Sequence, residues 1–397
     1  MTLEWLDSGP KPSIFLIDNT HCIAMKLTIE RSALLKSLGH VQSVVERRNT
    51  IPILSNVRLD AGDDEKLHLT ATDMDLAVIE AAPANVTQSG ATTTSAHMLY
   101  DIVRKLAEGA QVEIALIQDG GKLEIRSGRS RFTLACLPVE DFPVMAEGEL
   151  DHRFAVSASD IKRLIDKTGF AISTEETRYY LNGIYLHAAD GEGTKSLRAV
   201  ATDGHRLARV DTALPAGAEN IPGVIVPRKT VSELRKLIDE SDGDVMIALS
   251  DSKIRFAFDG AILTSKLIDG SFPDYERVIP SANDKIMTVD KQAFIQAVDR
   301  VSTISTEKSR AIKITLEDSQ MTLSASSPDA GAASEELDAQ YKLEKIEIGF
   351  NSRYVLDMAK QIVGETIEFR LADSASPTLV RDLEDENAVY VIMPMRV

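Results

Sequence analysis

The sequence predicts an α+β protein in which one domain plan occurs three times, each copy placing two helices on an antiparallel sheet. Three observations support this prediction. An amphipathic helix recurs at residues 94–106, 226–238 and 350–362. A short strand that leads into another helix recurs at residues 26–36, 153–163 and 286–296. Runs of alternating apolar and polar residues lie between and after these helices, as expected for strands that bury one face.

The recurring helix has an apolar stripe on one face and a cation on the other. The stripe follows the i, i+3, i+7 spacing of a helix and consists of Leu99, Ile102 and Leu106, then Val231, Leu234 and Ile238, then Val355, Met358 and Ile362. Five residues after each stripe begins, roughly opposite it, stand Arg104, Lys236 and Lys360. An acidic residue three positions earlier could pair with each cation: Asp101, Glu233 and Asp357. One such helix is typical of a solvated surface, but three indicate domains built to one plan.

The strand and helix that open each copy are separated by domain-sized intervals. Ile29, Val156 and Val289 correspond, at offsets of 127 and 133 residues. A hairpin region follows, marked by residues 69–73, 199–203 and 323–327. Closing strands are expected at 123–126 and 131–134, at 253–256 and 261–264, and at 378–381 and 388–391. We therefore expect domains at 25–150, 151–280 and 281–397, after an N-terminal extension of residues 1–24 that we expect to be poorly ordered.

Composition favours a cytoplasmic protein without a disulfide framework or a metal centre. Hydrophobic residues make up 44% of the chain and charged residues 26%. The two cysteines, Cys22 and Cys136, have no metal-ligand spacing, and we expect both to be reduced. No apolar run is long enough to span a membrane, and Ile14–Ile17 is too short for a signal-peptide core.

Charge is unevenly divided between the predicted helices and the rest of the chain. The net charge of −17 alone argues against a basic nucleic-acid-binding protein. However, the six helices expected at 31–48, 95–107, 158–172, 228–238, 290–303 and 351–363 carry a net +9, which leaves −26 for everything else. A basic helical layer of this kind attracts phosphates without reading sequence.

Helix dimensions limit how such a layer could surround DNA. Helices packed side by side lie about 9 Å apart, so six of them close too narrow a circle for a duplex. Twelve would leave a lumen of roughly 25 Å, wide enough for B-DNA about 20 Å across. One chain therefore cannot encircle DNA, whereas a closed dimer can.

Six motifs of the sequence resemble those of the bacterial sliding clamps, the beta subunits of the DNA polymerase III holoenzyme. The resemblance runs from Met25 to Val397, and the motifs lie at residues 126–132, 178–183, 201–207, 226–229, 272–275 and 391–397. It implies DNA-clamp domains that form half of a six-domain ring, closed by a head-to-tail homodimer around duplex DNA. It also implies a processivity factor of DNA replication that needs no cofactor. Its partners would be a replicative polymerase, a clamp loader and other clamp-binding proteins, which bind through short apolar peptides.

The resemblance also implies which residues perform these roles. DNA contacts are expected from Arg48, Tyr179 and Tyr180, and the basic helix faces add Arg104, Lys236 and Lys360. The subunit interface is expected at Phe132, Thr303 and Ile304. A peptide pocket between the second and third domains is expected from Leu181, Thr202, Gly204, His205, Arg206, Leu207, Pro273, Arg277, Val278, Asn351, Tyr354, Met393, Pro394, Met395, Arg396 and Val397. Ser309 stands where the family commonly has an aromatic residue, and Pro377 where it commonly has a serine. These differences bear on which peptides the pocket prefers and not on the role of the family.

Methionine side chains suit a pocket that accepts several partners because they repack easily. A methionine-rich C-terminus is also typical of a packed core, however, and the sequence alone favours that interpretation.

Two other functions compete with this hypothesis. An enzyme is suggested by residues 202–206, where His205 stands between an acid and a base, but no recognised catalytic or phosphate-binding motif accompanies it. Residues 191–195 lack the spacing of a phosphate loop and are expected to form a hairpin loop. An acidic scaffold that binds only proteins, with its basic helix faces merely solvated, is the other alternative.

Overall fold

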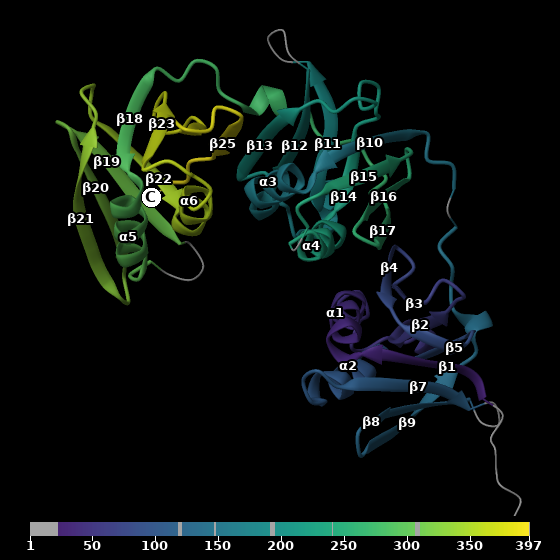
Figure 1. The fold of residues 1–397 in the computed structure, drawn as a ribbon. Coiled ribbons are helices and arrows are strands. Elements are labelled where there is room, and N and C mark those ends of the chain that lie inside the picture. Colours follow the sequence, from purple (N-terminus) through teal and green to yellow (C-terminus); the bar gives the residue numbers. More distant parts are fainter. Residues whose placement is uncertain are drawn as a thin grey trace, which may run out of the picture.

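The computed structural model describes residues 23–117, 121–146, 148–190, 195–239, 241–305 and 310–396. Residues 1–22, most of the predicted N-terminal extension, lie outside the described residues, as do Ser309 and Val397. Figure 1 shows three α+β domains along an arc, each with helices on one side of its strands.

The elements of domain 1 are β1 (Ile23–Glu30), α1 (Arg31–Gln42), η1 (Pro52–Ser55), β2 (Asn56–Ala61), β3 (Lys66–Thr72), β4 (Leu76–Pro83), β5 (Asn85–Gln88), β6 (Gly90–Ser95), α2 (Ala96–Lys105), β7 (Gln111–Ile117), β8 (Lys122–Ser127), β9 (Ser130–Leu137) and η2 (Val139–Asp141). The first helix is shorter than predicted, because it ends at Gln42 and not at residue 48. Val44 and Val45 continue the apolar spacing and are buried, but they do so from the loop after the helix.

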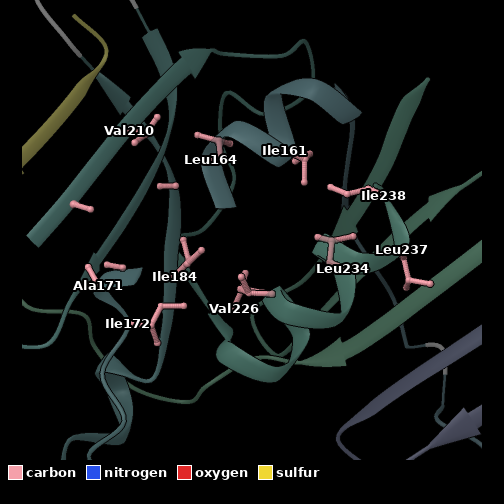
Figure 2. Packing of buried hydrophobic residues seen from close by; sticks show 14 of the residues in the cluster. Ile161, Leu164, Ala171, Ile172, Ile184, Val210, Val226, Leu234, Leu237 and Ile238 are labelled. Carbon is pink, nitrogen blue, oxygen red and sulfur yellow. The ribbon is translucent and has the colours of Figure 1, made fainter. Parts of the chain in front are cut away.

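The elements of domain 2 are β10 (His152–Ser157), α3 (Ala158–Thr168), η3 (Gly169–Ala171), η4 (Glu176–Leu181), β11 (Gly183–Asp190), β12 (Lys195–Thr202), β13 (Arg206–Ala213), β14 (Val224–Pro227), α4 (Arg228–Leu237), β15 (Asp244–Leu249), β16 (Lys253–Phe258) and β17 (Ala261–Lys266). Its core lies where α3 and α4 pack together over the strands. Figure 2 shows Ile161 and Leu164 of α3 across from Leu234 of α4 in this core. The predicted stripe residues Val231, Leu234 and Ile238 are all buried.

The linker to domain 3 contains η5 (Tyr275–Val278). The elements of domain 3 are β18 (Lys285–Asp290), α5 (Lys291–Ser302), β19 (Ala311–Glu317), β20 (Gln320–Ser327), β21 (Gly331–Gln340), β22 (Ile346–Asn351), α6 (Ser352–Ala359), β23 (Thr366–Leu371), β24 (Thr378–Asp382) and β25 (Ala388–Ile392). Helix α6 ends at Ala359, so Lys360 is its C-cap residue and not part of the helix proper. The predicted stripe is again buried at Val355, Met358 and Ile362.

A cation near the start of the first helix caps the end of the second helix in every domain. Arg31, Lys162 and Lys291 perform this role by donating hydrogen bonds of 2.7–3.2 Å to backbone carbonyls. The acceptors are Val103 and Arg104 in the last turn of α2, Asp239 and Ser241 after α4, and Ile362 and Val363 after α6. The last carbonyls of a helix lack partners within it, and a cation there also complements the helix dipole. Some of the basic charge on the helices therefore has a structural role in each domain.

The sheets continue from one domain into the next. Strand β4 of domain 1 pairs with β17 of domain 2 over five residue pairs, and β13 of domain 2 pairs with β25 of domain 3 over five pairs. The two junctions use equivalent strands in the same register, since Ala77 lies opposite Thr264 and Leu207 lies opposite Val391. The strands join into one 13-stranded and one 12-stranded sheet, each of which crosses a domain junction.

The same turn geometry precedes the junction strand in both domains, before β4 in domain 1 and before β13 in domain 2. Between β3 and β4, the Thr72 hydroxyl donates to the Leu76 carbonyl at 2.9 Å and accepts from the Met74 amide at 3.0 Å. Between β12 and β13, the Thr202 hydroxyl does the same with the Arg206 carbonyl and the Gly204 amide, at 2.7 and 3.1 Å.

Each turn is tied to the next domain by a charged group. Asp73, in the first turn, pairs with Lys229 of α4, which also donates to the Val44 carbonyl at 3.0 Å. Arg206, at the end of the second turn, pairs with Asp357 of α6 at 2.7 Å.

The six helices lie on the inner side of the arc, and the strands lie outside them (Figure 1). With their observed bounds, the helices carry a net +8 by Lys and Arg against Asp and Glu, and subtracting this from −17 leaves −25 for the rest of the chain. The predicted separation of charge is therefore also a separation in space.

Two strands inside the described sheets, β9 and β21, each have a stretch that pairs with a neighbouring strand on one side only. Residues 130–134 of β9 pair only with β8, and residues 331–338 of β21 pair only with β20. By their place in the repeat, β9 corresponds to β17 and β25, and β21 corresponds to β4 and β13. The open stretches of β9 and β21 are thus equivalent to the strands that pair at the two junctions within the chain.

Candidate peptide pocket and nucleic-acid surface

The turn between β12 and β13 supplies four of the predicted pocket residues. Asp203 holds it by accepting hydrogen bonds from the His205 and Arg206 amides at 2.9 and 3.0 Å. Gly204 has a φ of +87°, which a residue with a side chain rarely adopts. A Cβ on Gly204 would also collide with the Arg178 guanidinium. Glycine adopts this φ without strain, and His205 lies exposed at the tip of the turn.

Arg206 connects domain 2 to domain 3 through an unusually complete set of contacts. Its guanidinium lies over the rings of Tyr354 and Phe170, with 4.4 and 5.1 Å to their centroids. It also donates to the Phe170 carbonyl at 2.6 Å and to the carboxylates of Asp203 and Asp357 at 3.1 and 2.7 Å. Partial burial raises the pKa of the Tyr354 hydroxyl, so this ring stays neutral beside the cation. Arg206 is therefore a fixed wall of the site.

The C-terminal residues run across the junction and are held by their backbone. The Met393 amide donates to the His205 carbonyl and the Met395 amide to the Gly349 carbonyl, both at 2.9 Å. Met393 is 37% exposed and Met395 is partly exposed, so the interpretation of this segment as packed core is wrong. Leu181 and Leu207, by contrast, are 4% and 2% exposed and form buried support beneath the turn.

A cavity of about 450 Å³ lies at this junction, and only three predicted pocket residues line it: His205, Arg206 and Tyr354. Arg228 and Arg353, the first or second residues of α4 and α6, line it as well. Asn351 caps α6 by accepting from the Arg353 and Tyr354 amides. Pro273, Arg277 and Val278 lie exposed on the linker before domain 3, where Arg277 pairs with Asp274. Pro394 is half-buried and Arg396 exposed.

The cations predicted on the helix faces are exposed, but two of them are paired. Arg104 bonds Asp101 at 3.0 Å and Lys236 bonds Glu233 at 2.8 Å, the intrahelical pairs that the spacing allowed. The third pair differs, because Asp357 binds Arg206 of domain 2 and Arg353. Lys360 is exposed beyond the end of α6.

The remaining predicted DNA contacts lie on loops and a short helical turn. Arg48 is exposed in the loop after α1, outside the helix in which it was expected. Tyr179 and Tyr180 lie in η4, edge to face at 5.8 Å, with Tyr179 54% exposed. A Cβ on Gly270, in the linker to domain 3, would come to 3.1 Å from Tyr180, which places the pair beside that linker.

The predicted interface residues lie at the two ends of the chain's arc. Phe132 is half-buried in β9, on the open edge of domain 1. Thr303 and Ile304 directly follow α5 in domain 3, where Thr303 is exposed and Ile304 half-buried. The two sets do not meet within one chain (Figure 1).

Sequence reasoning missed Phe170, Asp357, Arg228 and Arg353 as parts of the site. Asp357 resembled an intrahelical partner of Lys360, and nothing in the sequence indicates that Arg206 lies closer. Arg228 belongs to the motif at residues 226–229, but Arg353, which lines the same cavity, is 125 residues away in the sequence. Such contacts between domains leave no periodic signal.

None of the described helices is both long and apolar enough to span a membrane. In the same described ranges, no group of three or more His, Cys, Asp or Glu residues is placed to hold a metal ion.

Three family models match consecutive parts of the chain. They are the N-terminal, central and C-terminal domains of the DNA polymerase III beta subunit, at residues 25–146, 155–274 and 276–396. The beta sliding clamp of Caulobacter vibrioides is 56% identical over 373 residues, which is 94% of this chain and 100% of that protein. That of Escherichia coli is 39% identical over 375 residues, with the same coverage.

Solved structures are similar over the same part of the chain. The Caulobacter crescentus beta sliding clamp superposes with a TM-score of 0.91 at 55% identity, covering 94% of this chain and 99% of that chain. The Bartonella birtlesii clamp bound to griselimycin has a TM-score of 0.91 at 51% identity, covering 94% and 100%. With its three clamp domains and helix-lined inner side, the chain belongs to the DNA polymerase III beta subunits, the sliding clamps that act as processivity factors in DNA replication.

Proposed function

We propose that two copies of this chain close head to tail into a ring around duplex DNA in the cytoplasm, without catalysing a reaction. The observation that carries the proposal is the inner layer of six helices with a net +8, within a chain whose remainder carries −25. A positive lumen attracts the phosphate backbone, whereas the acidic exterior repels other polyanions. Contacts to phosphates alone leave the ring free to slide, because they do not distinguish sequences.

Ring closure follows from the repeat and the open strand edges. In the register of β17 on β4, Leu263 lies opposite Val78 and Thr264 opposite Ala77. Transferring this register to the open edges places Phe132 opposite Ala333 and Thr133 opposite Ala332 of the partner. The β8–β9 hairpin carries Arg126, Arg129 and Arg131, and β21 carries Glu335, Glu336 and Asp338. The charges are therefore complementary, and two such junctions, each between β9 of one copy and β21 of the other, close the ring head to tail.

The lumen is proposed to contact DNA through residues from all three domains. Lys360 and Arg48 present exposed cations, and Tyr179 and Tyr180 can pack on the sugar–phosphate backbone. Arg104 and Lys236 contribute less, because Asp101 and Glu233 already neutralise them.

Partners are proposed to bind at the junction of domains 2 and 3. A replicative polymerase, a clamp loader or another clamp-binding protein would insert a short apolar peptide between the 202–206 turn, the linker at Val278 and the C-terminal methionines. Val278 and Met393, 42% and 37% exposed, offer the apolar contact, and Met395 can repack around different side chains. That the Bartonella birtlesii clamp binds griselimycin supports a ligand-binding surface of this kind in the family.

A disulfide across the proposed interface tests ring closure. Cys22→Ser and Cys136→Ser are introduced first, and Thr133→Cys is then combined with Ala332→Cys. Residues directly opposite on antiparallel strands lie within the Cα separation of a disulfide, so oxidation is expected to yield a covalent dimer and, with both interfaces linked, a closed ring.

The matched control combines Thr133→Cys with Ser326→Cys, which lies opposite Ala332 but one strand further away. That adds about 5 Å, so its Cα atoms would lie roughly 10 Å apart and no link should form. Equal cross-linking of both pairs, or none in either, contradicts the proposed register.

A further inference from the structure

A second cavity, of about 430 Å³, lies at the junction of domains 1 and 2. Its floor is formed by β2, β3 and β4 of domain 1 with β16 and β17 of domain 2. Its roof is the linker that joins the two domains, where Phe142, Pro143, Met145 and Leu150 line it and Val144 is 75% exposed. A volume of this size suits a small ligand or a few peptide side chains.

The repeat identifies what occupies the same place at the junction of domains 2 and 3. The strand pairings show which residues are equivalent at the two junctions. Thr70 corresponds to Val200, Ala77 to Leu207, Arg255 to Leu379 and Thr264 to Val391. The linkers correspond through Phe142-Pro143 and Phe272-Pro273, which makes Met145 the counterpart of Tyr275. The five residues of the second junction belong to one packed apolar cluster: Val200, Leu207, Tyr275, Leu379 and Val391. At the second junction, therefore, this space is filled by aromatic and aliphatic side chains.

At the first junction the same positions have different chemistry. Two leucines are replaced by Arg255 and Ala77, and two valines by Thr70 and Thr264. Arg58 adds a second guanidinium, with one bond of 2.7 Å to Asp60. Replacing large apolar residues by alanine and threonine opens the space, and the arginines make its floor cationic. The cavity thus combines an apolar roof with a floor of guanidinium and hydroxyl groups, which also carries the Asp60 carboxylate and the His68 ring. Two arginines against one aspartate leave this floor with a net positive charge, in a protein that is acidic overall.

We propose that this cavity is a second docking site, which takes a peptide with a carboxylate side chain next to a bulky apolar side chain. The carboxylate is bound by Arg58 and Arg255, since guanidinium groups bind carboxylates with geometric preference. The neighbouring apolar side chain lies under the linker against Phe142 and Met145. The charge complementarity selects an acidic peptide over a neutral or basic one. The site lies at a different junction from the pocket of the proposed function, so either can exist without the other.

Methionine methyl resonances of the full-length protein test this proposal. The probe is N-acetyl-Asp-Leu-Phe-amide, titrated into protein labelled with ¹³C at the methionine methyls, with the Met145 signal assigned from Met145→Leu. The Met145 resonance is expected to shift saturably. The isosteric probe N-acetyl-Asn-Leu-Phe-amide is expected to bind about tenfold more weakly at Met145, because a charge-assisted hydrogen bond is lost. The resonances of Met393 and Met395 report separately on the other pocket.

Two variants that copy the second junction provide the control. Ala77→Leu and Arg255→Leu install the residues found at the equivalent positions, Leu207 and Leu379, so each fits a sheet of this geometry. Each is expected to abolish the Met145 shift and leave the Met393 response unchanged. An unmoved Met145 signal at millimolar probe, equal affinity for the two probes at Met145, or a Met145 shift that persists in both variants overturns the proposal.

Discussion

Met74 and Gly204 occupy the same position in two copies of one turn, and both have a positive φ, of +78° and +87°. The turns differ in what surrounds them. Next to Met74, Asp75 pairs with Lys266 at 2.9 Å, whereas next to Gly204, His205 stacks on Tyr354 and meets the Met393 backbone. Beside this turn, the first junction thus carries an exposed ion pair, whereas the second presents a partly aromatic surface. This setting suits the peptide pocket proposed at the second junction, although the two turns share one backbone geometry.

Removing apolar contacts from the proposed pocket should weaken partner binding. Met395→Ala is expected to reduce the affinity for a partner peptide several-fold and to leave the dimer intact, because Met395 lies outside the open strand edges. Leu207→Ala should have a larger effect on binding, but it also removes a buried side chain and lowers the free energy of unfolding by about 2–5 kcal/mol. Fluorescence anisotropy with a labelled polymerase peptide measures binding, and light scattering measures the dimer.

The double variant Leu207→Ala, Met395→Ala provides the stricter form of this test. It should bind the peptide most weakly while remaining dimeric. Dissociation into monomers, or unchanged peptide affinity, would contradict the assignment of these residues to the pocket.

At the scale of elements, the second junction also depends on α3 and the turn before β25. Arg163 and Lys167 of α3 bond the two oxygens of Asp385, each at 2.6 Å. Burial alone would raise the pKa of Asp385, but the hydrogen bonds from Lys167 and Arg163 outweigh it and lower the pKa. Because Lys167 is itself buried, loss of this carboxylate would leave a buried ammonium without its partner.

This shift predicts a pH-dependent contribution to stability. The folded-state pKa of Asp385 lies below its unfolded value, so its contribution is fully present above about pH 4 and is lost as pH falls through the folded pKa. At pH 7, Asp385→Asn is expected to lower the free energy of unfolding by about 1–3 kcal/mol, the size of a hydrogen bond to a charged group. In denaturant melts of both proteins from pH 7 down to pH 3, the difference in the free energy of unfolding should narrow once the pH falls below about 4. A constant difference across this range would show that the charge is not responsible.

The elements themselves were largely predictable from the sequence, because their signals are local. All six expected closing strands lie within observed strands, for example 253–256 in β16 and 388–391 in β25. Helix α1 was predicted too long, since Val44 and Val45 keep the helical spacing after the chain has left the helix. The contacts of Arg206 with Phe170 and Asp357 were not predictable, because they depend on how two domains pack. The pocket and interface residues came from the family resemblance, and their roles remain predictions.

At the scale of the whole molecule, the threefold repeat determines both the arc of the three domains and the strand edges that stay open in one chain. Two junctions with one register, β4 on β17 and β13 on β25, bend three domains into an arc with the helices inside (Figure 1). The strands equivalent to those of the two junctions, β9 and β21, lie in domains 1 and 3 and are open on one side over residues 130–134 and 331–338. In the proposed ring, a second copy completes a junction between β9 and β21 twice, which gives twelve helices around one lumen. Whether the protein encircles DNA thus depends on two short strand edges in each subunit, those of β9 and β21.

The most direct test of this account is topological. The protein is loaded with a clamp loader onto a nicked circular plasmid, excess protein is removed by gel filtration, and the plasmid is then cut once with a restriction enzyme. A ring that holds DNA only by enclosing it should stay on the circle and slide off the linear product, unless the ends are blocked by bound proteins. Equal retention on circular and linear DNA would contradict encirclement and would indicate ordinary surface binding.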